Sequence, residues 1–405
     1  MNSSKQVLIK KAIIASMILL VILTISLIAK NKARVNSNLE IDINDLKIKD
    51  TVSVYIQDES GEYTSSDTIP TEGYSLNIEA SYCTVNGEED TSISLSYDVD
   101  TKTLNVSPLT TRGTKCYLYF EESKSATDII ENLYEDNQDI LAYDGTTDNN
   151  LRYIGADPAN YVYFNCDDYT NPSSSTCELW RIIGIFDENT HGISGEKLVK
   201  LIRNESLGDI AWDEEYGTNW STASLQMLLN KDYLNRTGDY SSTGITSQTR
   251  DMIETVTWKL GGIYSQYNKA STFYTAERGT AVSSGNPTEW EGKISLIYAS
   301  DYGYATSGGS TGRDTCLSYD LGDWGIYSNC YNNDWLNDVS DQWSISTFDH
   351  YTDYNNYVFD IEEPGFVDVT YSDAGIMVRP TVYLTSEVTI TGGSGTQTNP
   401  YTLSL

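Results

Sequence analysis

Histidine is almost absent from this chain of 405 residues, which contains only His191 and His350. A Ser-His-Asp or Cys-His triad would have to use one of the two, and no G-x-S-x-G stretch stands between a predicted strand and a helix. Both histidines lie in polar loop sequence, and no cysteine pair has the short spacing of a zinc site. We therefore predict no catalytic residue, no standard zinc site and no bound cofactor.

Basic residues are also scarce, since 26 Lys and Arg face 58 Asp and Glu. The first 34 residues hold 6 of the basic groups and none of the acidic ones, so residues 35–405 carry 20 against 58, a net charge of −38. Such a field repels nucleic acid and favours solubility, cations or a basic partner. The best match to an EF-hand loop starts at Asp187 but has Leu198 in place of the closing glutamate. We expect no nucleic-acid partner, and calcium has no motif to support it.

No cysteine precedes Cys83, which excludes a lipoprotein anchor, and the Cys-x-x-Cys motif of thiol exchange does not occur. An even number of cysteines beyond an export signal is typical of disulfides formed in an oxidising compartment. We predict three bridges between successive cysteines: Cys83–Cys116, Cys166–Cys177 and Cys316–Cys330.

Residues 12–29, AIIASMILLVILTISLIA, form an uncharged and mostly apolar run. As a helix this run is about 27 Å long, close to the roughly 30 Å hydrocarbon core of a bilayer. A cleaved signal peptide is the alternative, but a cut after Ala29 places Leu27 where a small residue is preferred. Basic residues flank both ends, so the positive-inside rule does not give the orientation. The cysteines indicate it, because disulfides form on the oxidising side of the membrane. We predict a single-pass signal anchor in the cell membrane, with residues 1–11 in the cytoplasm and the large domain extracellular.

The chain beyond the anchor divides by composition into four parts. Residues 30–45 are predicted to be a polar stalk, and residues 46–121 a small all-β, sandwich-like module held by one disulfide. Residues 122–141 contain a short helix and are predicted to connect this module to the next. Residues 142–405 mix strand and helix patterns, which predicts an α+β domain with a mostly antiparallel sheet.

Two helices are expected inside this last domain. Apolar residues recur at helical spacing over 221–234 and over 247–259. Strand patterns precede and follow them, as in ELWRIIGIF and MVRPTVYLT.

The polar loops are rich in aromatic residues, because many of the 31 Tyr and 8 Trp stand beside Asn, Asp or Gly. Flat rings next to short polar groups suit stacking on sugars and equally suit protein contacts. The alternative is that most of these rings belong to the core or cover long loops. We select nine candidate binding residues in the loops 212–220, 302–312 and 323–338, namely Trp212, Trp220, Tyr302, Tyr304, Trp324, Tyr331, Asn333, Asp334 and Trp335.

Arg379 interrupts the apolar run GIMVRPTVYL, where a charge is costly unless it is paired. We predict a structural role for it, with Asp301, Glu277 or another carboxylate as its partner. Pro380 removes a backbone donor and favours a sheet edge or a bulge at this point.

Several stretches in order, among them YFNCDDYTNPSSSTCELWRIIGIF, LIYASDYGYATSGG, NNDWL and GIMVRPTVYLTSEVTITGG, resemble a Firmicutes-type family of cell-surface proteins over residues 142–405. That family is similar to domains of the C-type-lectin-like fold, which also includes the formylglycine-generating enzymes. The chain lacks the Glu-Pro-Asn calcium tripeptide of lectins and the active-site cysteines of the formylglycine enzymes. The resemblance implies a C-type-lectin-like outer domain at the cell surface.

Three functions are consistent with these features. The first is a non-catalytic, membrane-anchored adhesion protein that recognises a glycan or a surface protein through its aromatic loops. The second is an extracellular enzyme that uses two carboxylates on a sugar or cell-wall polymer. The third is a structural component of a surface assembly without a discrete ligand.

Overall fold

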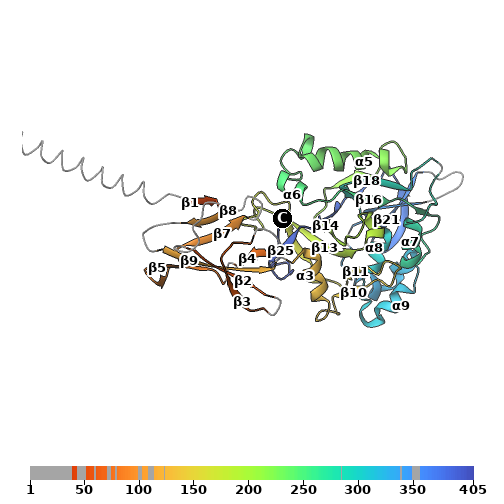
Figure 1. Cartoon of the computed structure of the whole chain (residues 1–405). Coiled ribbons are helices and arrows are strands. Elements are labelled where there is room, and N and C mark those ends of the chain that lie inside the picture. The colour runs from red at the N-terminus through yellow and green to blue at the C-terminus, as the bar shows by residue number, and fades with distance from the viewer. Residues whose placement is uncertain are drawn as a thin grey trace, which may run out of the picture. The chain divides into compact units, whose positions relative to one another are not determined.

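The computed structural model describes residues 39–42, 52–58, 61–70, 74–77, 80–98, 103–107, 114–122, 124–283, 285–337, 340–348 and 356–405. The chain divides into two compact units, Met1–Ser123 and Lys124–Leu405, here called unit 1 and unit 2 and treated separately (Figure 1). The predicted segments 1–11 and 12–29 lie outside the described residues. Within the described ranges, no helix has both the length and the apolar character to cross a membrane.

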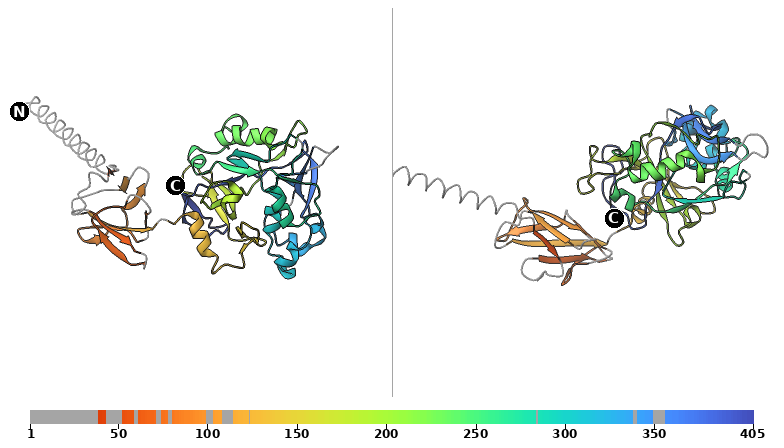
Figure 2. Two further views of the ribbon diagram at one scale, coloured as in Figure 1. Left: turned by 45° about the vertical axis from the view of Figure 1, so that its right-hand side comes forward. Right: turned by 90° about the horizontal axis from the view of Figure 1, so that it is seen from above.

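The described elements of unit 1 are all strands, drawn in orange and red in Figure 2. The larger sheet has the order β3 (Tyr63–Ser66), β2 (Val52–Gln57), β9 (Thr114–Glu122), β5 (Tyr82–Val85) and β6 (Glu88–Glu89), and β4 (Tyr74–Leu76) also pairs with β9. The smaller sheet has the order β1 (Leu39–Asp42), β8 (Thr103–Ser107) and β7 (Ser94–Asp98). Residues 39–42, which lie within the predicted stalk, form β1 and pair with β8.

One hydrophobic core joins the two sheets of unit 1. Alternate residues of β2 and β9 point into it, so that Val54 and Leu118 are buried beside Val106 from the smaller sheet. Cys83 and Cys116 are direct partners in the pairing of β5 with β9, and their disulfide is present as predicted. A core of this size is small, so the cross-strand bridge adds a substantial share of its stability.

Unit 2 contains two larger sheets. The first has the order β10 (Leu141–Tyr143), β11 (Leu151–Tyr153), β13 (Glu178–Phe186), β14 (Leu198–Arg203), β24 (Thr381–Tyr383) and β19 (Ile294–Ser295), with β12 (Tyr161–Phe164) also paired to β13. The second has the order β15 (Asp209–Ala211), β23 (Gly375–Met377), β20 (Gln342–Phe348), β21 (Tyr357–Glu362) and β22 (Phe366–Tyr371), with β17 (Gly262–Ile263) also paired to β20. Two short pairs complete it: β16 (Val256–Lys259) with β18 (Glu289–Gly292), and β25 (Thr389–Gly392) with β26 (Thr402–Ser404). The described pairs of the first sheet are antiparallel, whereas β17 and β23 run parallel to β20.

Short helices connect and cover these sheets. They are α3 (Ala126–Leu133), α4 (Glu188–His191), α5 (Ser224–Met227), α6 (Ser247–Asp251), α7 (Ala270–Glu277), α8 (Ala299–Tyr304), α9 (Arg313–Leu317) and α10 (Ser328–Tyr331). Short segments of other helix types accompany them: η2 (Trp220–Thr222), η3 (Leu228–Tyr233), η4 (Gly238–Tyr240), η5 (Gly309–Thr311) and η6 (Leu321–Ile326). The prediction of an α+β fold with mostly antiparallel sheets is confirmed for this unit.

Two helix predictions change in detail. The segment 221–234 is helical but is divided among η2, α5 and η3. The segment 247–259 is helical only as far as Asp251, because Val256–Lys259 pairs with β18. Thr255, Val256 and Thr257 are β-branched residues, whose side chains favour a strand.

Helix α3 belongs to unit 2 and is not an independent connector. Ser125 caps it in a capping box with Asp128, and the backbone N–H of Ala126 donates to the carbonyl of Val388. Ala126 and Ile130 are buried in the core of unit 2. Unit 2 therefore begins with the residues that lead into this helix, well before residue 142.

Candidate binding cleft

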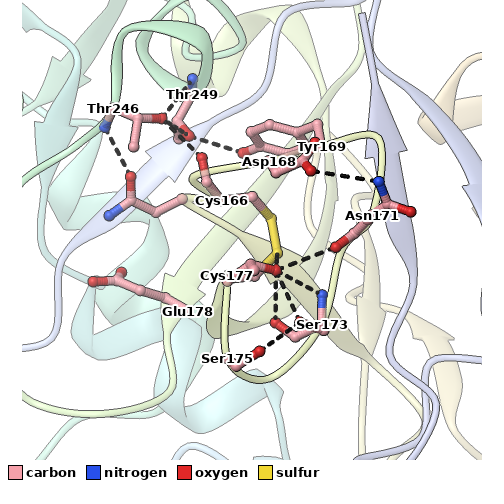
Figure 3. The surroundings of a disulfide bond; sticks show 12 residues. Cys166, Asp168, Tyr169, Asn171, Ser173, Ser175, Cys177, Glu178, Thr246 and Thr249 are labelled. Carbon is pink, nitrogen blue, oxygen red and sulfur yellow. Dashed lines mark hydrogen bonds between the residues drawn. A yellow bond between two sulfur atoms is a disulfide. The ribbon is translucent and has the colours of Figure 1, made fainter. Parts of the chain in front are cut away.

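The β12–β13 hairpin is held by the disulfide Cys166–Cys177 (Figure 3). The two strands pair from Tyr161 and Arg181 to Phe164 and Glu178, and the bridge closes directly beyond the last pair. This is the predicted bridge, and it leaves no free thiol at either position. The hairpin therefore serves as scaffold, and its chemistry must be sought in the side chains that it presents.

The loop between the two cysteines is ordered by its own side chains. Asp168 Oδ1 accepts the backbone N–H of Thr170 at 2.9 Å, and Tyr169 Oη lies 2.9 Å from Oγ1 of Thr249. Burial raises the pKa of Tyr169 to about 12, so its phenol stays neutral. Thr246 Oγ1 also donates to the carbonyl of Cys166. These bonds tie the loop to α6.

Arg181 is the most constrained side chain of this hairpin. Its guanidinium carbon lies 4.1 Å from the ring centre of Tyr161 and 4.6 Å from that of Trp335. Nε donates to Oδ1 of Asn160 at 2.8 Å, and Nη2 donates to Oδ1 of Asp157 at 3.0 Å. Two aromatic faces and two fixed acceptors therefore hold the guanidinium plane in one orientation.

The third nitrogen of this guanidinium is unpaired. Nη1 of Arg181 has no hydrogen-bond partner among the described residues, yet it is not one of the atoms sealed from solvent. Burial lowers the pKa of Arg181, and the charge of Asp157 works in the opposite direction. An arginine remains charged at neutral pH even so. One charged donor thus stays available to a ligand.

A cleft of about 440 Å³ lies at this position. Residues from the β12–β13 hairpin, from the segment after β14, from the loop after α10 and from the end of β23 line it. The polar and aromatic members that matter here are Asp157, Tyr161, Arg181, Ser206, Trp335 and Arg379. The indole Nε1 of Trp335 donates to the carbonyl of Tyr153 at 2.9 Å, which fixes this ring in the wall.

Arg379 also lines the cleft, and two of its contacts are hydrogen bonds to neutral oxygens. Its Nε donates to the carbonyl of Arg203 at 3.0 Å, and its Nη1 lies 3.4 Å from Oε1 of Gln342. Asp301 and Glu277 both make other contacts. These hydrogen bonds attach Arg379 to β14 and β20, and its structural role stays a prediction.

Asp301 and Glu277 belong to a buried polar network instead. Asp301 contacts Lys200 at 2.6 Å and Arg152 at 2.7 Å, while Glu277 accepts hydrogen bonds from the side chains of Ser300 and Ser346. These side chains are buried. The network fixes the centre of unit 2 and faces neither described cleft.

Most of the predicted binding aromatics lie in the core. Trp212 and Trp220 have ring centres 5.2 Å apart, and Tyr302 and Trp324 have theirs 5.4 Å apart. These four rings and Tyr304 are at most 3% exposed. These five rings therefore pack in the core of unit 2, where burial of their apolar surface stabilises the fold, and the structure gives no support to a binding surface at these positions.

The remaining candidates come from one loop, and the structure separates them. Tyr331 and Asn333 are half-buried, and Asn333 Nδ2 donates to the carbonyl of Asn329 at 2.9 Å. Asp334 is buried with one oxygen on the N–H of Leu336, and burial raises its pKa well above the ordinary value. Only Trp335 of the nine candidates lines the cleft beside Arg181. The predicted disulfide Cys316–Cys330 is present and links α9 to α10 ahead of this loop.

A second cleft of about 450 Å³ has a mostly apolar lining from α3 and the β25–β26 pair. Ile129, Leu133, Ile140 and Ile390 contribute to it. Its described lining holds no charged side chain, and its polar side chains are Asn137, Thr391, Ser394 and two tyrosines.

The two histidines add no chemistry to these clefts. His191 is buried, its Nδ1 accepts the N–H of Ile193 and its Nε2 lies 3.1 Å from the carbonyl of Phe186. Burial lowers its pKa, so the ring is neutral and structural. His350 lies outside the described residues.

Four carboxylates gather on the second sheet of unit 2. Asp360 and Asp368 are direct partners in β21 and β22, and Glu362 and Asp341 are close enough to act on the charge of Asp360. Both oxygens of Asp360 are buried without a hydrogen-bond partner, and burial with these neighbouring charges raises its pKa to about 8. In the described part of the chain, no three His, Cys, Asp or Glu side chains are placed to hold a metal ion.

Unit 1 has an aromatic cluster of its own on the outer face of its larger sheet. Tyr55 stacks on Tyr119 at 4.7 Å, Tyr82 stacks on Tyr117 at 4.9 Å, and Tyr63 meets the edge of Tyr119 at 5.0 Å. The rings cover one another across the strands. These cross-strand contacts stabilise the sheet, and each ring remains partly exposed.

Comparison with known proteins adds no assignment: no family model, curated protein or solved structure matches this chain.

The candidate site was only partly visible in the sequence. Trp335 and Arg379 were singled out, but Arg181 was hidden within the apolar run LWRIIGIF. A charged residue inside a predicted buried strand is the signal that could have identified it, by the same reasoning as for Arg379.

Proposed function

We propose that this chain is a membrane-anchored extracellular binding protein, and that unit 2 recognises a glycan or a protein through the cleft beside Arg181. In this proposal, unit 2 has a C-type-lectin-like fold, residues 12–29 anchor the chain, and unit 1 holds the binding unit away from the membrane. No catalytic step is assigned.

The observation that carries the proposal is the fixed arginine in the cleft. Arg181 is oriented by Tyr161, Trp335, Asn160 and Asp157, and it presents one unpaired N–H edge. A preorganised donor at the wall of a concave polar site is typical of ligand recognition. The three disulfides support an extracellular location, because such bonds persist in oxidising compartments.

Binding is preferred to the two alternatives for a physical reason. A carboxylate enzyme needs two acids that converge on a substrate pocket. The acid group around Asp360 lines neither described cleft, and Asp360 itself is buried. Asp157 and Glu205 do line the cleft beside Arg181, but Asp157 is already paired with Arg181 at 3.0 Å and Glu205 is exposed. A purely structural assembly component would have no use for an open charged donor at the wall of a cleft.

The test is a binding screen of the full chain kept in detergent. A glycan array and a pull-down from cell-surface extracts are expected to return a ligand that is lost in Trp335→Ala. A ligand that still binds Trp335→Ala would place recognition elsewhere. Failure of both screens would overturn the proposed function.

A further inference from the structure

We propose that the cleft beside Arg181 takes the carboxylate of an acidic sugar, such as a hexuronic acid residue of a glycan. This inference rests on the proposed function and names the ligand class of the same site.

The first argument is the geometry of the arginine. Arg181 is only 6% exposed, so its guanidinium is already desolvated and ordered before a ligand arrives. Nε and Nη2 are used by Asn160 and Asp157, which leaves Nη1 as the donor toward the cleft. A charge-assisted hydrogen bond from a fixed guanidinium to a carboxylate is about twice as strong as a neutral one. A neutral sugar hydroxyl can accept the same hydrogen bond but lacks the attraction between opposite charges.

The second argument is the balance of charge in the cleft. Among the described lining residues, Arg181 and Arg379 face Asp157 and Glu205, so the wall is formally neutral. A single carboxylate adds one negative charge beside two guanidinium groups. A phosphate dianion adds two, and the chain already carries a net charge of −32. The balance favours a monoanion over phosphate or a polyanion.

The third argument concerns the rest of the lining, which suits hydroxyl groups. Asn204, Ser206 and Asn337 place short polar side chains around the cleft. At about 440 Å³ the cleft lies within the range of roughly 300–1,000 Å³ typical of small-ligand sites.

A peptide carboxyl terminus carries the same charge but fits this lining less well. Peptides are recognised through an open sheet edge or through apolar pockets for their side chains. Met377 is the one large aliphatic side chain among the described lining residues, and the other lining residues are polar, aromatic or small. The sugar is therefore the ligand that we infer, and a peptide is the alternative outcome of the test.

The experiment measures binding of three probes to the full chain by saturation-transfer NMR and calorimetry. Methyl glucuronide is expected to bind at least about ten-fold more tightly than its methyl ester or methyl glucoside. Equal affinity for the three probes would overturn the inference, while specific binding of a neutral glycan would leave the proposed function in place. Tighter binding of a short peptide with a free carboxyl terminus would also overturn it.

Two conservative substitutions test whether the ligand binds in this cleft, and neither removes a large buried side chain. Arg181→Lys keeps a charge but loses the planar fork, and glucuronide affinity should fall about ten-fold or more. Glu205→Gln removes an exposed negative charge from the rim, and glucuronide affinity should rise about two-fold with glucoside affinity unchanged. Glu387→Gln, exposed and outside the cleft, is the matched control. Unchanged glucuronide affinity in both Arg181→Lys and Glu205→Gln would exclude this cleft.

Discussion

Lys200 Nζ lies 2.6 Å from Oδ2 of Asp301 in the centre of unit 2, and both side chains are fully buried. Arg152 binds the other oxygen of Asp301 at 2.7 Å, and its Nε reaches Asp144 at 2.9 Å. Burial disfavours the charged carboxylate, but the charges of Lys200 and Arg152 outweigh it and hold the pKa of Asp301 well below its usual range. Lys200 and Asp301 therefore form a buried ion pair in which each charge is stabilised by the other.

The first prediction concerns this pair. Asp301→Asn leaves the buried charge of Lys200 without its counter-ion and Arg152 with Asp144 alone, and it should lower the free energy of unfolding of unit 2 by about 3–5 kcal/mol. Lys197→Met, which removes an exposed pair with Glu131, is the matched control and should change it by less than about 1 kcal/mol. All eight tryptophans lie in unit 2, so urea unfolding followed by tryptophan fluorescence reports on this unit. Equal changes in the free energy of unfolding for the two variants would contradict the conclusion that Lys200 and Asp301 form a buried ion pair.

The second prediction concerns the buried carboxyl of Asp360. Its pKa of about 8 in the folded chain exceeds the ordinary value near 3.8, so the folded state binds the proton more tightly than the unfolded state. The free energy of unfolding should therefore fall as the pH rises from about 4 to about 8.

Asp360→Asn removes this titration and should flatten the pH profile, with a gain of up to about 4 kcal/mol relative to the parent chain between pH 5 and pH 8. Asp136→Asn, on an exposed turn, should keep the parent slope. Urea titrations at several pH values give the comparison, and a parent profile without this slope would refute the assignment.

The third prediction concerns the hairpin disulfide. Replacing both Cys166 and Cys177 by serine frees a loop with a sequence separation of 11 and should cost about 3 kcal/mol. The loop 167–176 should then become sensitive to protease.

The corresponding double change at Cys83 and Cys116 is the control, because it lies in unit 1. It should leave the tryptophan unfolding curve of unit 2 in place. A shift of that curve would show that the two units unfold together.

The fourth prediction separates core from binding surface. Trp324 is fully buried against Tyr302, so Trp324→Ala should lower the free energy of unfolding by about 3–5 kcal/mol, and Trp324→Phe by less. Ligand affinity per folded molecule should be unchanged in Trp324→Phe. A loss of affinity with normal stability would restore the earlier interpretation of this residue as a binding residue.

Local sequence pattern was sufficient to predict features that depend on a single strand or on a single pair of cysteines. The alternation in KCYLYFEE places Leu118 and Phe120 on one face of β9, and both are buried. The three successive disulfides were also predictable, because export and an even cysteine count leave few uses for these residues.

The aromatic loops show where local pattern fails. Trp220, Trp324 and Trp335 stand in similar polar surroundings in the sequence, but only Trp335 reaches a cleft. Which of these rings is covered depends on residues far away in the chain, as in the contact of Trp335 Nε1 with the carbonyl of Tyr153. Composition carries no information about such contacts.

The sequence by itself determined the mixed α+β class, the antiparallel strands and the three bridges, because these follow from side-chain periodicity and cysteine chemistry over short distances. Only the tertiary structure decided where the buried charges pair and where a ligand can bind. Arg181 becomes a candidate binding residue because Tyr161 is its partner on the neighbouring strand and Trp335, more than 150 positions away in the chain, packs against its guanidinium. Long-range packing brings such groups together, and no local pattern encodes it.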